Sequence, residues 1–140
     1  MKGTVVKDIA VLYADDDAPS RTIVNIALTK RMGLSRVTLL PDSADFLARM
    51  QAANQHYDLV LLDIHMKPYT GFQLLKMLRA LPEYADTPIV ALTASVMNEE
   101  VRQLEEAGFD SVVAKPIDID RFPQIVERIM QGERIWTIVD

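Results

Sequence analysis

The sequence predicts an α/β fold in which five parallel strands form a doubly wound sheet with helices on both faces. Short apolar runs alternate along the chain with segments in which apolar residues recur every three or four positions. The runs are too short for helices and lack the alternation of strands that face water, which is typical of parallel strands buried on both faces. At 140 residues, the chain has the length of one domain.

Each predicted strand is followed by a predicted helix. The strands should span residues 9–13, 37–40, 59–62, 89–92 and 112–114. Three helices are marked by apolar stripes, which consist of Val24, Ala27, Leu28 and Met32, of Leu74, Leu75, Leu78 and Leu81, and of Phe122, Ile125, Val126, Ile129 and Met130. The first helix should be capped by Asp17, carry Pro19 in its first turn and end at Gly33, and the last should end at Gly132.

The other two helices carry weaker patterns. Residues 43–53 are moderately amphipathic. Residues 98–107 offer only Val101, Leu104 and Ala107 as apolar positions, which is a narrow stripe. We therefore expect this second helix to be shallowly anchored on the sheet.

The composition argues against several classes of protein. A net charge of −5 with scattered basic residues argues against a nucleic-acid-binding surface. The chain has no cysteine, which excludes disulfides and thiolate metal sites. The sequence shows neither a signal peptide nor an apolar run of the roughly 20 residues that span a bilayer, so we expect a cytoplasmic domain without a membrane partner.

Polar side chains follow four of the five predicted strands. They are Asp15, Asp16 and Asp17 after the first strand, Asp63 after the third, Thr93 after the fourth and Lys115 after the fifth. Ligands of open α/β sheets bind at the carboxyl ends of the strands, so we expect these side chains to converge on one rim. The second strand is followed only by Leu40, Pro41 and Asp42, as expected if it lies at the edge of the sheet.

Such a rim suits phosphoryl chemistry. Clustered carboxylates repel one another by about 4 kcal/mol per pair at ~4 Å and an effective dielectric constant of ~20. A divalent cation relieves this repulsion, and hard oxygen ligands favour Mg²⁺, with Mn²⁺ as a second fit. An ionised carboxylate can itself accept a phosphoryl group, while a hydroxyl and an ammonium hold the remaining phosphoryl oxygens.

Four motifs, all in order, resemble the receiver domain of response regulators over residues 8–131. The matching segments are VLYADDDAPSR at 11–21, DLVLLDIHM at 58–66 with Gly71 eight residues after Asp63, PIVALTA at 88–94 and AKP at 114–116. Each motif is weak alone, but together they are specific. The resemblance implies a flavodoxin-like (βα)5 fold with strand order 2-1-3-4-5. We expect a single-domain receiver over residues 1–132, followed by an apolar tail at 133–140.

By this resemblance, Asp63 is the phosphoacceptor of a two-component phosphorelay. It would receive its phosphoryl group from a sensor histidine kinase or a histidine phosphotransfer protein. Asp16 would ligate Mg²⁺ directly together with Asp63, Asp15 would do so through water, and the backbone carbonyl of His65 would add a further ligand.

The resemblance also assigns roles at the fourth and fifth strands. Thr93 and Lys115 would contact the phosphoryl oxygens, and the Lys115–Pro116 bond is a candidate cis peptide. The resemblance implies a phosphoprotein that catalyses its own phosphorylation and dephosphorylation, not an enzyme that turns over a separate substrate. It would act by changing its contacts with a downstream protein partner.

Among the residues that depart from the family pattern or occupy its variable positions, His65 and Val112 bear most on the mechanism. His65 lies two residues after Asp63, where we expect a rim side chain that tunes water access rather than an imidazole that ligates metal. Val112 stands where many receivers carry an aromatic ring that swings inward when Thr93 moves. Valine lacks that ring, so we expect the switch to run through the helix at 98–107 and the loop before it.

Other readings stay open at this stage. A Mg²⁺-dependent phosphohydrolase with an aspartate nucleophile is the main alternative, although such enzymes commonly carry a second aspartate where this chain has His65. An unphosphorylated scaffold conflicts with the complete set of polar residues, and a flavin-binding protein would need a Ser/Thr-rich loop after the first strand. The apolar residues 135–139 could fold back on the domain, form a homodimer contact or begin a linker.

Overall fold

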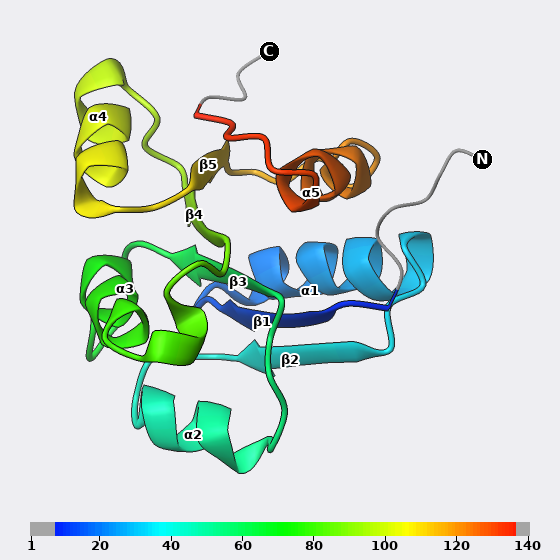
Figure 1. The fold of residues 1–140 in the computed structure, drawn as a ribbon. Helices are drawn as coiled ribbons and strands as arrows, with labels where there is room; N and C mark the ends of the chain where they lie inside the picture. Colours follow the sequence, from blue (N-terminus) through cyan, green and yellow to red (C-terminus); the bar gives the residue numbers. More distant parts are fainter. Residues whose placement is uncertain (1–7, 137–140) are drawn as a thin grey trace.

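A five-stranded parallel sheet forms the centre of the molecule in a computed structural model that describes residues 8–136 (Figure 1). The strands lie in the order β2-β1-β3-β4-β5, and every neighbouring pair is parallel. They are β1 (Ala10–Ala14), β2 (Arg36–Leu40), β3 (Leu59–Asp63), β4 (Ile89–Thr93) and β5 (Ser111–Ala114). The predicted flavodoxin-like fold and its strand order are confirmed.

The helices cover the sheet in two layers (Figure 1). On one face lie α1 (Ala18–Ile26), which continues as a π-helical turn (Ala27–Arg31), and α5 (Phe122–Met130). On the other face lie α2 (Phe46–Ala52), α3 (Gly71–Arg79) and α4 (Asn98–Ala107), and a 3-10 turn (Pro82–Tyr84) precedes β4. Within residues 8–136, no helix is both long enough and apolar enough to cross a membrane.

The strand boundaries differ by about a residue from several predictions. β1 begins at Ala10, and β3 and β4 extend to Asp63 and Thr93. Every residue of these three central strands is buried, as the apolar runs predicted. The expectation that the second strand is also buried on both faces was wrong, because β2 forms an edge of the sheet and most of its side chains are partly exposed.

The helix boundaries show where local backbone geometry overrides an apolar pattern. α2 begins at Phe46 rather than at residue 43, because Asp45 has a φ of +49°, a left-handed conformation outside the helical range. The predicted ends at Gly33 and Gly132 are confirmed, with φ values of +74° and +102°. Leu81 lies beyond the last residue of α3.

α4 has the predicted bounds and is held by few apolar contacts. Of its ten residues only Val101 and Leu104 are buried, whereas Ala107 is exposed. Met97 precedes the helix without a side-chain capping hydrogen bond. α5 instead buries four of its nine residues, so α4 is the more weakly anchored helix of the two.

The described part of the C-terminal tail folds back onto the outer edge of β5. The Val112 N–H donates to the Ile135 carbonyl at 2.7 Å, and the Ile135 N–H donates to Ser111 Oγ at 2.8 Å. Ile135 is buried, and Trp136 packs against the α2–α4 core. The tail therefore adopts the fold-back arrangement up to residue 136. Residues 137–140 lie outside the described residues, and the boundary at 132 stays a prediction.

Close approach of α3 to the end of β3 requires a glycine at residue 71. The Gly71 N–H donates to the Ile64 carbonyl at 3.0 Å. An added Cβ would lie 2.6 Å from the Asp63 backbone oxygen and 3.0 Å from the Ile64 Cα. Both are backbone atoms, so neither can rotate away as the end of a side chain could.

Replacing Gly71 with alanine should therefore destabilise the fold through a steric clash with the end of β3. We expect Gly71→Ala to lower the free energy of unfolding by about 2–3 kcal/mol in urea titrations. Gly33→Ala is the matched control, because its added Cβ meets nothing within 4 Å and only its φ of +74° is unfavourable. An unchanged stability of Gly71→Ala, or unshifted amide resonances at Asp63 and Ile64, would contradict this account.

Candidate functional site

Three carboxylates meet at the carboxyl ends of neighbouring strands. Asp63 is the last residue of β3, and Asp15 and Asp16 directly follow β1, which pairs with β3. One oxygen from each lies within 4.8 Å of the others. Asp15 is fully buried and Asp63 is 5% exposed, whereas Asp16 is exposed. The structure thus brings together the acidic residues that the sequence singled out.

Lys115 follows β5, which forms one edge of the sheet, and its side chain reaches this cluster. Its Nζ lies 2.8 Å from Asp15 Oδ2 and 3.3 Å from Asp63 Oδ1. The Lys115 N–H donates to the Thr93 carbonyl at 2.9 Å, which ties the end of β5 to the end of β4. The Lys115–Pro116 bond is cis, as predicted, and so is the Lys67–Pro68 bond. The ammonium therefore neutralises part of the negative charge at the rim.

Thr93 supplies the hydroxyl at the end of β4. The side chain is 2% exposed, and its Oγ1 accepts a hydrogen bond from the Ser95 N–H at 3.1 Å. This contact uses the oxygen as an acceptor, which leaves the hydroxyl proton for an acceptor at the rim.

Burial and neighbouring charges shift the pKa values of Asp63 and Lys115. Burial, followed by the nearby charge of Asp15, raises the pKa of Asp63 from 3.8 to about 6, although Lys115 opposes the shift. Burial alone would lower the pKa of Lys115, but its hydrogen bonds and charge interactions with Asp15 and Asp63 outweigh it and raise the value. Burial and the Asp15 charge thus disfavour the ionised form of Asp63, whereas the Lys115 ammonium is held in its charged form.

Asp17 caps the first helix, as the sequence predicted. Its Oδ2 accepts from the Ser20 N–H at 3.0 Å and from the Ser20 hydroxyl at 2.6 Å. These hydrogen bonds lower the pKa of the Asp17 carboxyl, with a smaller contribution from Lys115. The Asp17 carboxylate therefore forms its hydrogen bonds within the first turn of α1.

His65 lies at the rim with an exposed side chain. Together with Thr93, Ser95, Phe72 and Glu100 it lines part of a small pocket of about 130 Å³ beside α4. This position matches the expected rim side chain. The role of the His65 backbone carbonyl as a metal ligand stays a prediction.

Two residues that were not singled out from the sequence form hydrogen bonds to the acidic cluster and to the loop after β3, respectively. The Tyr13 hydroxyl donates to Asp15 Oδ2 at 2.5 Å, and Ser43 exchanges two hydrogen bonds with the Tyr69 backbone, at 2.7 and 2.8 Å. Tyr13 could have been noticed, because residues i and i+2 of a strand point to the same face. Ser43 carried no such signal, since its partner is 26 positions away.

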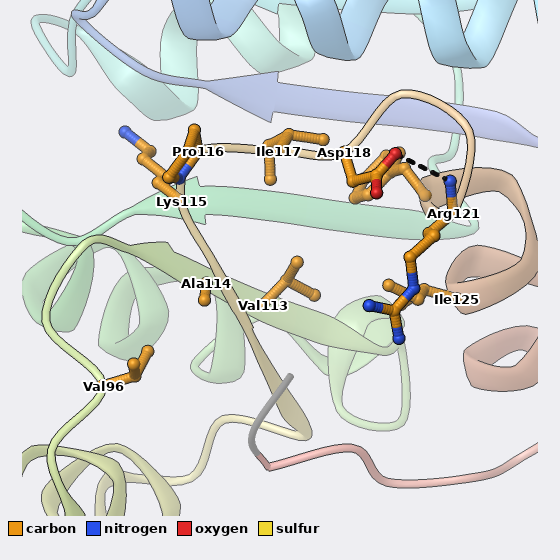
Figure 2. A pocket seen from close by; sticks show the side chains of 10 residues that line it. Val96, Val113, Ala114, Lys115, Pro116, Ile117, Asp118, Arg121 and Ile125 are labelled. Carbon is orange, nitrogen blue, oxygen red and sulfur yellow. Dashed lines mark hydrogen bonds between the residues drawn. The ribbon is translucent and has the colours of Figure 1, made fainter. Parts of the chain in front are cut away.

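A separate pocket of about 380 Å³ lies beside the β5–α5 connection (Figure 2). The Lys115 side chain points away from Arg121 and Ile125 in this view. Asp118 in the same pocket accepts hydrogen bonds from the Asp120 and Arg121 N–H groups, at 2.9 and 3.4 Å, and so organises the turn before α5. Lys115 thus lines this mostly apolar pocket, while its ammonium contacts Asp15 and Asp63.

Comparison with known sequences agrees with this geometry. The family model of the response regulator receiver domain matches residues 11–127. The sensory/regulatory protein RpfC of Xanthomonas campestris pv. campestris is 32% identical over 114 residues, which cover 80% of this chain and 15% of RpfC. The signal transduction histidine-protein kinase BarA of Escherichia coli K12 is 30% identical over 124 residues, covering 89% of this chain and 13% of BarA. The chain thus spans only a small part of the curated relatives that it matches.

Solved structures share the fold. The chemotaxis response regulator CheY4 of Vibrio cholerae superposes with a TM-score of 0.78 at 25% identity, covering 88% of this chain and 99% of CheY4. The receiver domain of the sensor histidine kinase PA1611 of Pseudomonas aeruginosa PAO1 has a TM-score of 0.75 at 25% identity, covering 90% and 100% of the two chains. That structure is described with a magnesium ion coordinated in its active-site cleft. The family match covers most of the chain, and the fold and the convergent rim residues agree with it. This chain therefore belongs to the response regulator receiver domain family of two-component signalling.

Proposed function

We propose that this receiver domain accepts a phosphoryl group on Asp63 and thereby switches its contacts with a protein partner. One observation carries the proposal: Asp63 sits beside two further carboxylates, with the Lys115 ammonium 3.3 Å from its Oδ1. A carboxylate held in this way is an ionisable nucleophile whose neighbours can receive the negative charge of an incoming phosphoryl group.

The donor set fits Mg²⁺. The three carboxylate oxygens are hard ligands within 4.8 Å of one another, and burial together with the charge of Asp15 raises the pKa of Asp63. Asp16 and Asp63 would hold the ion directly, Asp15 would hold it through water, and the His65 carbonyl would add a ligand; Mn²⁺ suits the same donors. Bound Mg²⁺ would supply charge neutralisation for the carboxylates and the phosphoryl oxygens.

The chemical step is a displacement at phosphorus. A bond forms between an Asp63 carboxylate oxygen and the phosphorus of a phosphohistidine, while the phosphorus–nitrogen bond breaks and its electron pair stays with the leaving imidazole. The Lys115 ammonium, now beside Asp63, would contact a phosphoryl oxygen as the charge arrives. The Thr93 hydroxyl would donate a hydrogen bond to another phosphoryl oxygen.

The relatives support the class of phosphoryl donor. BarA is named as a histidine-protein kinase, and the PA1611 domain belongs to a sensor histidine kinase. A sensor histidine kinase or a histidine phosphotransfer protein is thus the proposed donor for this chain. The receiver would signal to a downstream protein, and a homodimer stays open as one form of that contact.

Acetyl phosphate with Mg²⁺ tests the phosphoacceptor directly. We expect intact-mass spectrometry to show one phosphoryl group on the wild type and none on Asp63→Asn, because Asp15, which also lies beside Lys115, already accepts hydrogen bonds from the Tyr13 hydroxyl and the Asp17 N–H. Asp42→Asn is the matched control, since Asp42 follows β2 at the same end of the sheet but is paired with Arg49 at 2.7 Å. It should be phosphorylated like the wild type.

The wild type without an adduct, or Asp63→Asn with an undiminished one, would refute the assignment. Continuous release of phosphate from a phosphate ester over many turnovers would instead favour the phosphohydrolase.

The pKa of Asp63 makes a prediction about the metal-free protein. Because the folded-state pKa of about 6 exceeds the ordinary 3.8, the folded state binds this proton more tightly than the unfolded state does. The resulting stability is present below pH 3.8 and is lost as the pH rises to about 6. At about pH 8, Asp63→Asn should therefore raise the free energy of unfolding by about 1–2 kcal/mol, allowing for partial solvent screening.

Urea titrations across this pH range check the sign. The gain from Asp63→Asn should shrink below pH 3.8, where Asp63 is protonated in both states of the wild type. Mg²⁺ should stabilise the wild type above pH 6 more than it stabilises Asp63→Asn. A variant less stable than the wild type at high pH would contradict the charge imbalance.

The weak anchoring of α4 predicts which residues should change their structure or dynamics on phosphorylation. Val112 is fully buried and has no ring to move, so the response to Thr93 should pass to the loop before α4 and to α4 itself. Adding the phosphoryl mimic beryllofluoride should change hydrogen-exchange protection across residues 93–107. α5, with four buried residues, serves as the internal control. Unchanged protection across residues 93–107 would show that the switch takes another route.

A further inference from the structure

Tyr13 is a buried tyrosine whose hydroxyl is committed to the acidic cluster. It lies on β1 with no exposed surface, two residues before Asp15. Its hydroxyl donates to Asp15 Oδ2 at 2.5 Å. Burial and this hydrogen bond raise the pKa of the Tyr13 phenol well above its usual range, so the group is a donor at any working pH.

The donors around Asp15 nearly fill its acceptor positions. Oδ2 accepts from the Tyr13 hydroxyl and lies 2.8 Å from Lys115 Nζ, while Oδ1 accepts from the Asp17 N–H at 2.9 Å. A carboxylate offers about four acceptor positions, two on each oxygen. The protein therefore fills both positions on Oδ2 and one on Oδ1. One position on Oδ1 is left for a cation or for its water.

The same contacts place the ammonium beside the phosphoacceptor. Lys115 is shared between Asp15 Oδ2 and Asp63 Oδ1. If the Asp15 carboxylate turned about its terminal bond, Lys115 would have to follow or lose the shorter of its two contacts. The hydroxyl of Tyr13 opposes that rotation, because it fixes which oxygen faces Lys115.

We propose that Tyr13 is a positioning residue of the site, whose hydroxyl orients Asp15 so that one Oδ1 acceptor position would be open to Mg²⁺ or its water and Lys115 is held beside Asp63. This inference rests on the proposed function, and it adds a residue outside the acidic cluster. Hydrogen bonds to carboxylates are shorter and stronger than those between neutral groups, and groups that orient metal ligands contribute strongly to metal affinity.

Another buried tyrosine provides a matched control. Tyr57 is also fully buried, and its hydroxyl donates to Thr38 Oγ1 at 2.9 Å. Tyr57→Phe and Tyr13→Phe remove the same atom from equally buried rings. Only Tyr13→Phe takes a donor from the acidic cluster.

The experiment measures Mg²⁺ affinity by calorimetry for the wild type and both variants. We expect Tyr13→Phe to weaken Mg²⁺ binding about tenfold and Tyr57→Phe to leave it unchanged, even where both lose similar stability in urea. Phosphorylation by acetyl phosphate at subsaturating Mg²⁺ should slow in Tyr13→Phe and recover as Mg²⁺ is raised.

A spectroscopic measurement that begins with the wild type provides a second test. Mg²⁺ draws charge from Asp15, so the near-ultraviolet tyrosine absorbance should shift when the ion is added. The shift should persist in Tyr57→Phe and vanish in Tyr13→Phe. If Tyr13→Phe does not fold, a wild type that binds Mg²⁺ without this shift overturns the proposal.

The outcomes separate this inference from the proposed function. A wild type that binds Mg²⁺ and is phosphorylated, with a folded Tyr13→Phe that matches it in affinity, overturns the role of Tyr13 alone. A wild type that binds Mg²⁺ but takes no phosphoryl group overturns the phosphoacceptor role and leaves the Tyr13 affinity test standing. A wild type that binds no Mg²⁺ overturns both.

Discussion

The charge imbalance among Asp15, Asp63 and Lys115 is the constraint on which the rest of the site depends. Two buried carboxylates share a single ammonium, at 2.8 and 3.3 Å, and the exposed Asp16 adds further negative charge. Burial and the Asp15 charge leave the pKa of Asp63 at about 6. A site built in this way is stabilised by added positive charge.

The fold withstands this repulsion because the groups rise from buried strands. β1 and β3 are buried along their whole length, so small displacements that would relax the carboxylates would disturb close-packed side chains. Backbone contacts add to this rigidity. Gly71 lets α3 pack against the end of β3, and Asp17 holds the first turn of α1 directly after the acidic pair.

The region around β5 contains both strongly and weakly held elements. The tail seals part of the β5 edge through Ile135, while Asp110, which precedes β5, is paired with Arg79 at 2.7 Å. α4 lies between these fixed points and Thr93 but is anchored by only two buried side chains. Of α4 and α5, α4 is therefore the helix that should open more easily, since elements with few buried contacts open most easily.

Much of the fold and most of the rim could be predicted from the sequence. The period of the apolar residues identifies five strands and their helices, and parallel strands must deliver the residues that follow them to one rim, which accounts for Asp15, Asp63, Thr93 and Lys115. Strand order came from family resemblance rather than from periodicity. Only the tertiary structure decided which Asp15 oxygen faces Lys115 and showed that the Tyr13 hydroxyl donates to the same oxygen. It also decided that Ile135 covers the β5 edge. Those contacts depend on side-chain rotation and on distances between segments remote in sequence, whereas periodicity reports only which face a residue occupies.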